Sequence, residues 1–69
     1  MKKKQCELSK GDIIRVEFGD YDNWVTVVVD MVETEGKWSK LICHYLNSNR
    51  SVEMYGYPND MVEIIGIEN

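Results

Sequence analysis

The sequence contains no alanine, and it has only one proline and two cysteines among its 69 residues. Alanine is the best helix former, and its absence beside eight valines and six isoleucines favours strands over helices. The apolar fraction of 43% is ordinary for a folded chain, so extensive disorder is not expected. The composition therefore predicts a small all-β protein with room for one domain.

Long apolar runs are also missing, so no membrane-spanning helix is expected and the chain is predicted to be cytoplasmic. The first residues, MKKKQCELSKGD, have a basic flank with no apolar segment after it, unlike a secretory signal. Two cysteines are too few for a disulfide scaffold. Cys6 and Cys43 are therefore interpreted as free thiols in a reducing compartment, and the alternative is one bridge that ties the N-terminal segment to the core.

Charge is unevenly distributed along the chain. Residues 1–10 carry four lysines and one glutamate, which gives +3, whereas residues 11–69 carry four basic and eleven acidic side chains, which gives −7. We expect residues 1–10 to form a flexible basic arm and residues 11–69 to form the folded domain. Phosphate backbones are bound by clustered lysines and arginines, and the acidic body has no such cluster.

Alternating apolar and polar residues predict five strands, at residues 13–18, 24–33, 38–46, 50–55 and 62–67. In the second strand Val25, Val27, Val29 and Met31 would form one continuous apolar face. The third strand alternates imperfectly, which indicates a bulge or a strong bend within it. A helical turn is expected at residues 58–61, just before the last strand.

Three segments carry a resemblance at the level of strand order: KGDIIRV at the start, WVTVVVDMV in the long second strand and YPNDMVEI near the end. Over about residues 9–67 the pattern resembles the Src-homology-3-like small barrels, in particular their Tudor and KOW branch. The resemblance implies a single five-stranded antiparallel barrel with a short helical turn before the last strand. An oligonucleotide-binding barrel is the alternative, but no segment is long enough for the helix it needs.

No catalytic, metal or cofactor site is predicted, and we do not expect an enzyme. The glycines do not have the spacing of a phosphate-binding loop. Cys43 and His44 are neighbours in a predicted strand, so their side chains would point to opposite faces and could not share a metal ion or a proton. Carboxylate pairs such as Glu33 and Glu35 occur in polar turns, where ordinary solvation is expected.

The aromatic residues are the main candidates for binding a partner. Five of the seven are predicted at strand ends or on outward faces, where exposed Trp and Tyr often mark interfaces. With two neighbouring carboxylates they make the predicted partner-binding set: Tyr21, Trp24, Trp38, Tyr55, Tyr57, Asp20 and Asp22. The alternative is that these rings simply close the ends of the barrel, with Phe18 inside. The Tudor-like resemblance further implies a cage for a methylated ammonium group at Tyr21, Trp24, Tyr45 and Tyr55.

These features predict a non-enzymatic protein–protein interaction module that docks on a basic partner, such as a nucleic-acid-handling or defence enzyme. Its small size suggests a phage or bacterial regulator or inhibitor. The alternative is a nucleic-acid-binding barrel of Tudor or KOW type, with bases stacked on Trp24 or Trp38. Its predicted contacts are Lys2, Lys3, Lys4, Arg15, Lys37, Lys40 and Arg50. A homodimer formed by pairing of strand edges is a third alternative.

Overall fold

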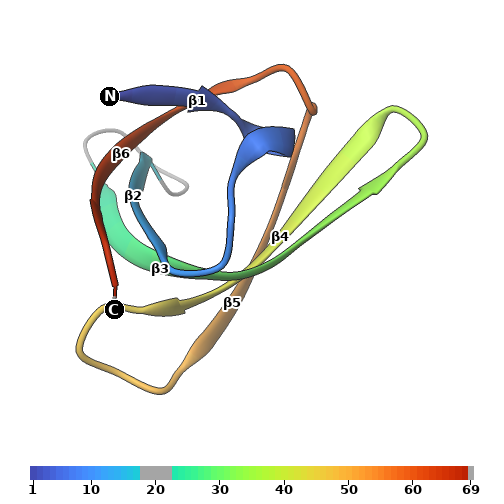
Figure 1. Cartoon of the computed structure of the whole chain (residues 1–69). Coiled ribbons are helices and arrows are strands. Elements are labelled where there is room, and N and C mark those ends of the chain that lie inside the picture. Colours follow the sequence, from blue (N-terminus) through green and yellow to red (C-terminus); the bar gives the residue numbers. More distant parts are fainter. Residues whose placement is uncertain (18–22, 69) are drawn as a thin grey trace.

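The computed structural model describes residues 1–17 and 23–68. Within these ranges it contains six strands and one short 3₁₀ helix, shown in Figure 1: β1 (Lys2–Lys4), η1 (Gln5–Glu7), β2 (Asp12–Glu17), β3 (Trp24–Glu35), β4 (Trp38–Tyr45), β5 (Ser51–Gly56) and β6 (Met61–Ile67). All strand pairs are antiparallel, and they form one sheet in the order β1-β6-β2-β3-β4-β5. The all-β prediction is confirmed, and the five predicted strands correspond to β2 to β6.

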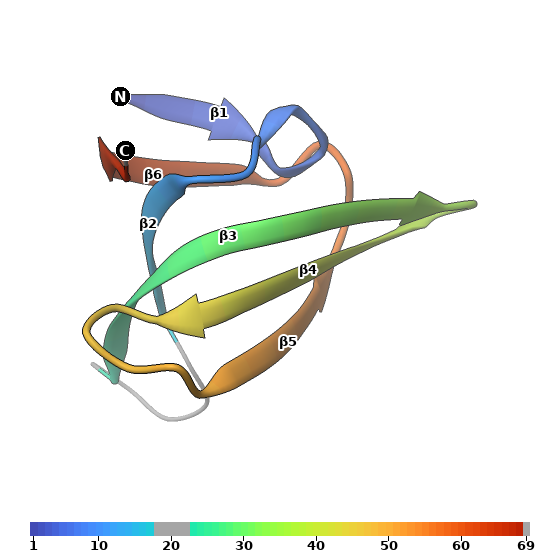
Figure 2. The same ribbon diagram turned by 60° about the horizontal axis from the view of Figure 1, so that its bottom comes forward.

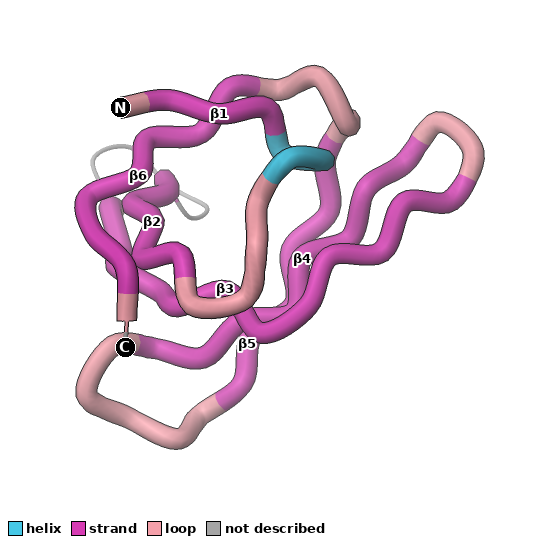
Figure 3. The backbone as a smooth tube through the Cα atoms, in the orientation of Figure 1, coloured by secondary structure: helices cyan, strands magenta, loops and turns pink. Residues whose placement is uncertain are grey.

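The sheet is open, so the prediction of a closed five-stranded barrel is wrong in both closure and strand number. Figure 2 shows the strands curving round a common interior, with β1 and β5 as the two edges. Figure 3 shows η1 beside the loop that joins β5 to β6. The Gln5 N–H donates to the Asp60 carbonyl at 2.8 Å, and the Cys6 N–H donates to the Pro58 carbonyl at 3.1 Å. These bonds connect η1 to the loop between β5 and β6.

The N-terminal segment is a strand where the sequence predicted a flexible arm. Lys2 to Lys4 pair with β6, and the Ile64 N–H donates to the Met1 carbonyl at 2.8 Å. Leu8 then enters the core. The lysines thus form an exposed strand. The buried residues that follow them anchor the N-terminal segment to the rest of the domain.

The helical turn also lies elsewhere than predicted. A 3₁₀ helix occurs at Gln5–Glu7. Residues 57–60 form only a single turn before β6, in which the Asp60 N–H donates to the Tyr57 carbonyl at 3.0 Å. The Asp60 carboxylate accepts from the Tyr57 N–H at 3.0 Å and satisfies a second backbone group of that turn.

The core lies on the inner face of the curved sheet. Its buried members alternate along their strands, as the period of two requires. They are Leu8, Ile14, Val27, Val29, Leu41, Cys43, Val62 and Ile64. Phe18, which the sequence placed in this core, lies outside the described residues.

The apolar face predicted for β3 is wrong beyond Val29, because the strand contains a bulge. Val29 pairs with Cys43 and Met31 pairs with Ile42, so Asp30 is an extra residue on β3. β4 itself alternates regularly, and the predicted irregularity belongs to its partner strand. Because one inserted residue reverses the direction of every later side chain, Met31 is half exposed and Val32 packs against the core.

The β3–β4 hairpin extends beyond the body of the sheet, as Figures 1 and 2 show. Gly36 in its turn has φ +61°, a backbone conformation that favours glycine. The hairpin therefore presents its outer face to solvent along with the neighbouring part of β5. Among the described residues, no helix is long and apolar enough to cross a membrane.

Candidate functional site

Three of the predicted aromatic residues come together on the outer face of β4 and β5. Ser39 pairs with Gly56, which places Trp38 beside Tyr57, and their rings stack with centroids 5.1 Å apart and planes 19° apart. Tyr55 lines an open hollow together with Trp38 and Glu35. We call Trp38, Tyr55 and Tyr57 the aromatic face.

The alternation of β4 and β5 explains why these rings point outward. Ser39 and Leu41 are buried on the inner face, so Trp38 must lie on the outer one. The exposed fractions are 55% for Trp38, 66% for Tyr55 and 54% for Tyr57. The three rings therefore lie outside the core. Their exposure does not fit the alternative interpretation, in which they would be packed into the ends of a barrel.

Carboxylates surround the aromatic face. Glu35 pairs with Trp38 and Glu33 pairs with Lys40 across the β3–β4 ladder. On β5, Glu53 lies 3.6 Å from the Lys40 ammonium and accepts a hydrogen bond from the Tyr55 hydroxyl at 3.4 Å. Of these described side chains on the outer face of β3, β4 and β5, three are carboxylates and one is an ammonium group that is already paired.

Trp24 lies in a different environment at the start of β3. The Arg15 guanidinium sits over its ring, 5.5 Å from the centroid, as expected of a cation–π contact. Lys2, Glu17 and Glu63 line the same hollow, and Glu17 pairs with Trp24 across the β2–β3 ladder. With 48% of its surface exposed, Trp24 is as accessible as Trp38 but belongs to another part of the sheet.

The other predicted partner-binding residues, Asp20, Tyr21 and Asp22, lie outside the described residues. The cage implied by the Tudor-like resemblance does not form from its described members. Tyr45 packs against the core, Trp24 stands under Arg15, and Tyr55 lies on the aromatic face. These three rings therefore do not converge on one point.

The basic residues predicted to contact nucleic acid are dispersed. Only Lys2 and Arg15 line one hollow with Trp24. Lys3 lies 4.0 Å from the buried Asp12 carboxylate, and Lys40 is paired with Glu53. The rest are spread over three elements: Lys4 in β1, Lys37 in the β3–β4 turn and Arg50 before β5. The set does not make one continuous basic patch.

The cysteines and the histidine are separated by the strand geometry that the sequence indicated. Both cysteines are free, with Cys6 exposed and Cys43 buried. Burial, with the nearby Asp30 charge, raises the pKa of the Cys43 thiol from 9.0 to about 11. His44 points to the other face, where its Nδ1 lies 2.9 Å from Asp30 Oδ1. No metal-binding cluster of three or more His, Cys, Asp or Glu residues occurs in the described ranges.

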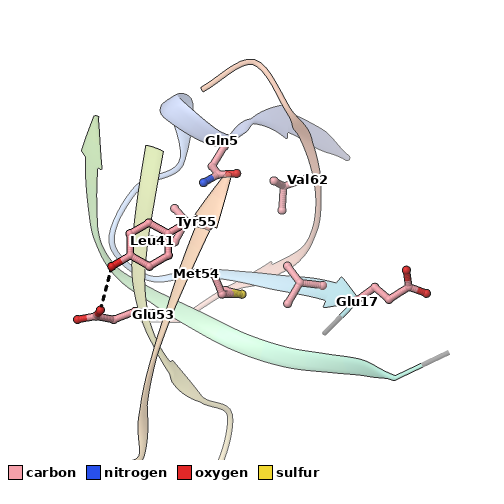
Figure 4. A pocket seen from close by; sticks show the side chains of 8 residues that line it. Gln5, Glu17, Leu41, Glu53, Met54, Tyr55 and Val62 are labelled. Atoms are coloured by element: carbon pink, nitrogen blue, oxygen red, sulfur yellow. Dashed lines mark hydrogen bonds between the residues drawn. The ribbon is translucent and has the colours of Figure 1, made fainter. Parts of the chain in front are cut away.

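A groove beside β5 was missed from the sequence. It has a volume of about 470 Å³ and an apolar floor formed by Val16, Leu41, Met54 and Val62. Glu17 and Glu53 stand at its rims, as the labelled side chains in Figure 4 show. Alternation identifies Met54 as inward-facing, but the groove exists only because the curved sheet does not close on itself at the β5 edge. No local pattern in the sequence predicts where the sheet stays open.

Comparisons with known proteins give no match: no family model, no curated protein and no solved structure is similar to this chain. Its function must therefore be inferred from the side chains and surfaces described above. The aromatic face and the adjoining groove are the two surfaces whose chemistry is most specific.

Proposed function

We propose that this chain is a non-enzymatic protein-interaction module that binds a basic segment of a partner protein at its aromatic face. The observation that carries the proposal is the exposed stack of Trp38 on Tyr57, with Tyr55 beside it and carboxylates around all three. The faces of such rings attract cations, and large rigid rings bury area at little entropic cost. A lysine or arginine side chain would gain from both the rings and the carboxylates.

The charge of the whole domain supports a basic partner. The chain carries a formal charge of −4, and residues 11–69 alone carry −7, which would speed encounter with a positively charged surface. Proteins that handle nucleic acids have such surfaces because they contact phosphates. A small acidic domain that covers one of these surfaces would act as an inhibitor or regulator, and this is the role that we propose.

We further propose that the fold is a Src-homology-3-like small barrel that remains open at the β5 edge. Support comes from the strand order, in which β6-β2-β3-β4-β5 joins the last predicted strand to the first and then continues through the others in sequence. In this proposal β1 is an addition to the outside of β6, and η1 lies across the open side.

Nucleic-acid binding is the second candidate, and one observation favours it. Arg15 lies over Trp24, and Lys2 lines the same hollow, which combines cations with a ring on which a base could stack. The pairing of Lys3 with Asp12 and of Lys40 with Glu53 weakens this candidate. The two candidates use different tryptophans, so they can be separated by substitution.

The test measures binding of a fluorescent basic peptide, Gly-Lys-Gly-Lys-Gly-Lys-Gly, by anisotropy. We expect Trp38→Ala to weaken binding by about tenfold or more, because it removes the central ring of the face. Trp24→Ala is the matched control, since its ring is similarly exposed, and it should change binding by less than about threefold. A glutamate peptide with the same spacing should not bind.

A mixed-sequence single-stranded oligonucleotide is measured in the same way. If it binds and the basic peptide does not, and if Trp24→Ala abolishes the binding, the nucleic-acid candidate replaces the proposed function. Equal losses of peptide binding in Trp24→Ala and Trp38→Ala would also overturn the assignment of the aromatic face. Circular dichroism shows for each variant that the sheet is intact.

A further inference from the structure

The outer side of β5 is an unpaired strand edge in the part of the chain that the structure describes. β5 pairs with β4 and stands last in the strand order. The Tyr45 N–H donates to the Arg50 carbonyl at 3.0 Å. Because hydrogen-bonded pairs alternate in an antiparallel ladder, every second residue after Arg50 also bonds to β4. The backbone groups of Glu53 and Tyr55 therefore face away from β4 and toward the free edge.

The two edges of the sheet differ in how well they resist further pairing. β1 is three residues long and consists entirely of lysine, and both properties are typical of protected edges. β5 is six residues long, contains no lysine or proline, and carries a single charge, at Glu53. Of the two edges, β5 is therefore the one that can accept another strand.

The groove described above runs along this same edge. Its floor offers apolar contacts at Leu41, Met54 and Val62, and its rims carry Glu17 and Glu53 (Figure 4). Tyr55 lines both the groove and the hollow beside Trp38, so a chain bound along β5 would reach the aromatic face. Backbone partners, an apolar floor and negative rims occur together on one side of the molecule.

We infer that an extended segment of the basic partner binds here as an additional antiparallel strand on β5. The inference rests on the proposed function and specifies how the partner is held. In an antiparallel pair the residue opposite Glu53 lies on the same face as Glu53, so it is a lysine or arginine. Its two neighbours lie opposite Val52 and Met54 and point to the inner face, where both of these side chains pack against the core, so they are apolar. The partner segment thus alternates basic and apolar residues.

A second copy of this chain fits the edge poorly. Two-fold pairing of β5 with itself, centred on the residues that face the edge, would place Glu53 directly opposite Glu53 of the other copy. Like charges opposite one another destabilise a strand pair. Each chain also carries a formal charge of −4, which opposes self-association. Charge complementarity therefore favours a basic partner.

The experiment compares two peptides of equal length and charge. One is Thr-Lys-Val-Lys-Val-Lys-Thr, which can form the alternating strand, and the other is the Gly-Lys-Gly-Lys-Gly-Lys-Gly peptide used above. We expect the strand peptide to bind about tenfold more tightly, because it adds apolar contacts and strand propensity. Two N-methylated forms supply the backbone control. Methylation of the lysine amides should weaken binding by about tenfold, and methylation of the valine amides by less than threefold.

Hydrogen exchange measured by nuclear magnetic resonance locates the contact. The amides of Glu53 and Tyr55 should become protected when the strand peptide is added, whereas the amide of Met54 should already be protected by β4. Equal binding of both N-methylated forms, or no new protection at Glu53 and Tyr55, would overturn strand addition. If the glycine peptide still binds through Trp38 in that case, the proposed function stands.

Failure of both basic peptides to bind would overturn the proposed function and the strand addition together. Self-association is measured by analytical ultracentrifugation without peptide. A dimer that dissociates when Glu53→Lys is introduced would instead assign the β5 edge to a second copy of the chain. That result would overturn the inferred occupant. A monomer at micromolar concentration is the expected result.

Discussion

The two tryptophans are exposed to nearly the same degree, 48% for Trp24 and 55% for Trp38, but the charged groups that contact or flank their rings differ. Trp24 lies under the Arg15 guanidinium, so its ring already contacts a cation of the same chain. Trp38 stacks on Tyr57 beside the carboxylates of Glu33 and Glu35. An exposed ring that already has a cation has less to offer a partner than one surrounded by negative charge. Exposure alone, which the sequence suggested for both, does not separate them.

The strands that carry the two tryptophans share one hydrophobic core. The largest effect on stability that we expect comes from the Cys43 thiol in this core. Cys43 is fully buried, and its pKa is raised from 9.0 to about 11 mainly by desolvation. Below pH 9 the thiol is protonated in the folded and unfolded chain alike, and its contribution to stability is complete. Between pH 9 and 11 only the unfolded chain releases the proton, so the free energy of unfolding should fall by roughly 2–3 kcal/mol.

Urea unfolding between pH 8 and 11.5 measures this loss of stability. Subtracting the pH profile of Cys43→Ala isolates the contribution of the thiol. Parallel pH profiles for the two proteins would contradict a protonated, buried Cys43. A thiol reagent at pH 8 should modify Cys6, which is exposed, and leave Cys43 intact in the folded protein.

The next largest effect on stability concerns the contact between the N-terminal segment and the strand that carries Trp38. The Gln5 side-chain amide donates to the Ser39 carbonyl at 3.1 Å, and this buried bond joins η1 to the strand that carries Trp38. Gln5→Ala should lower the free energy of unfolding by about 1–3 kcal/mol, since a buried bond is lost. Gly56→Ala should act in the same direction, because its new Cβ would lie 2.6 Å from Gln5 Oε1.

Urea denaturation at pH 7 checks both variants. Lys4→Ala, a substitution of the exposed neighbour, is the matched control and should change stability by less than about 0.5 kcal/mol. If Gln5→Ala were no more destabilising than Lys4→Ala, the N-terminal segment would be a loose addition to the sheet, as the sequence first suggested.

A charge exchange tests whether the carboxylates distinguish the two tryptophans. Glu33→Lys with Glu35→Lys gives Trp38 cationic neighbours in place of carboxylates and should weaken the binding of Gly-Lys-Gly-Lys-Gly-Lys-Gly by about 10–30-fold. Glu63→Lys with Glu68→Lys changes the net charge equally on the other part of the sheet and should weaken it by less than about threefold. Equal losses would mean that net charge, and not the local arrangement, attracts the peptide.

The sequence predicted much of the fold because alternation is a local property. The positions of β2 to β6 and the outward direction of Trp38 follow from apolar residues two apart, such as Leu41 and Cys43. β1 was missed because three consecutive lysines carry no apolar pattern, and its partner strand is far away in the sequence. The bulge at Asp30, which turns Met31 outward, likewise depends on the partner strand.

The candidate site was only partly predictable for the same reason. Single residues of the aromatic face could be identified, but the stack of Trp38 on Tyr57 depends on the register of β4 against β5. The groove depends on the curvature of the whole sheet and on where it stays open. Contacts between distant segments are set by register and closure, which no short stretch of sequence encodes.

The smallest expected effect is a difference in collisional quenching between the two rings. Trp38→Phe leaves Trp24 as the only tryptophan, and Trp24→Phe leaves Trp38. Iodide should quench Trp24 more efficiently than it quenches Trp38, because the Arg15 guanidinium lies over the Trp24 ring and attracts the anion. Caesium should be favoured at Trp38, where Glu33 and Glu35 attract the cation. Each preference should be about twofold at low salt and should vanish in 1 M salt, where charges are screened.

Arg15→Gln then tests the cause of the difference. In the protein that retains only Trp24, it should remove the preference for iodide and lower the free energy of unfolding by about 0.5–1 kcal/mol, the usual size of an exposed cation–π contact. Lys37→Gln removes a cation from the β3–β4 turn and should leave Trp24 unchanged. A preference for iodide that survives Arg15→Gln would mean that the guanidinium does not determine the charge environment of Trp24. The contrast between the tryptophans would then have to come from the carboxylates around Trp38 alone.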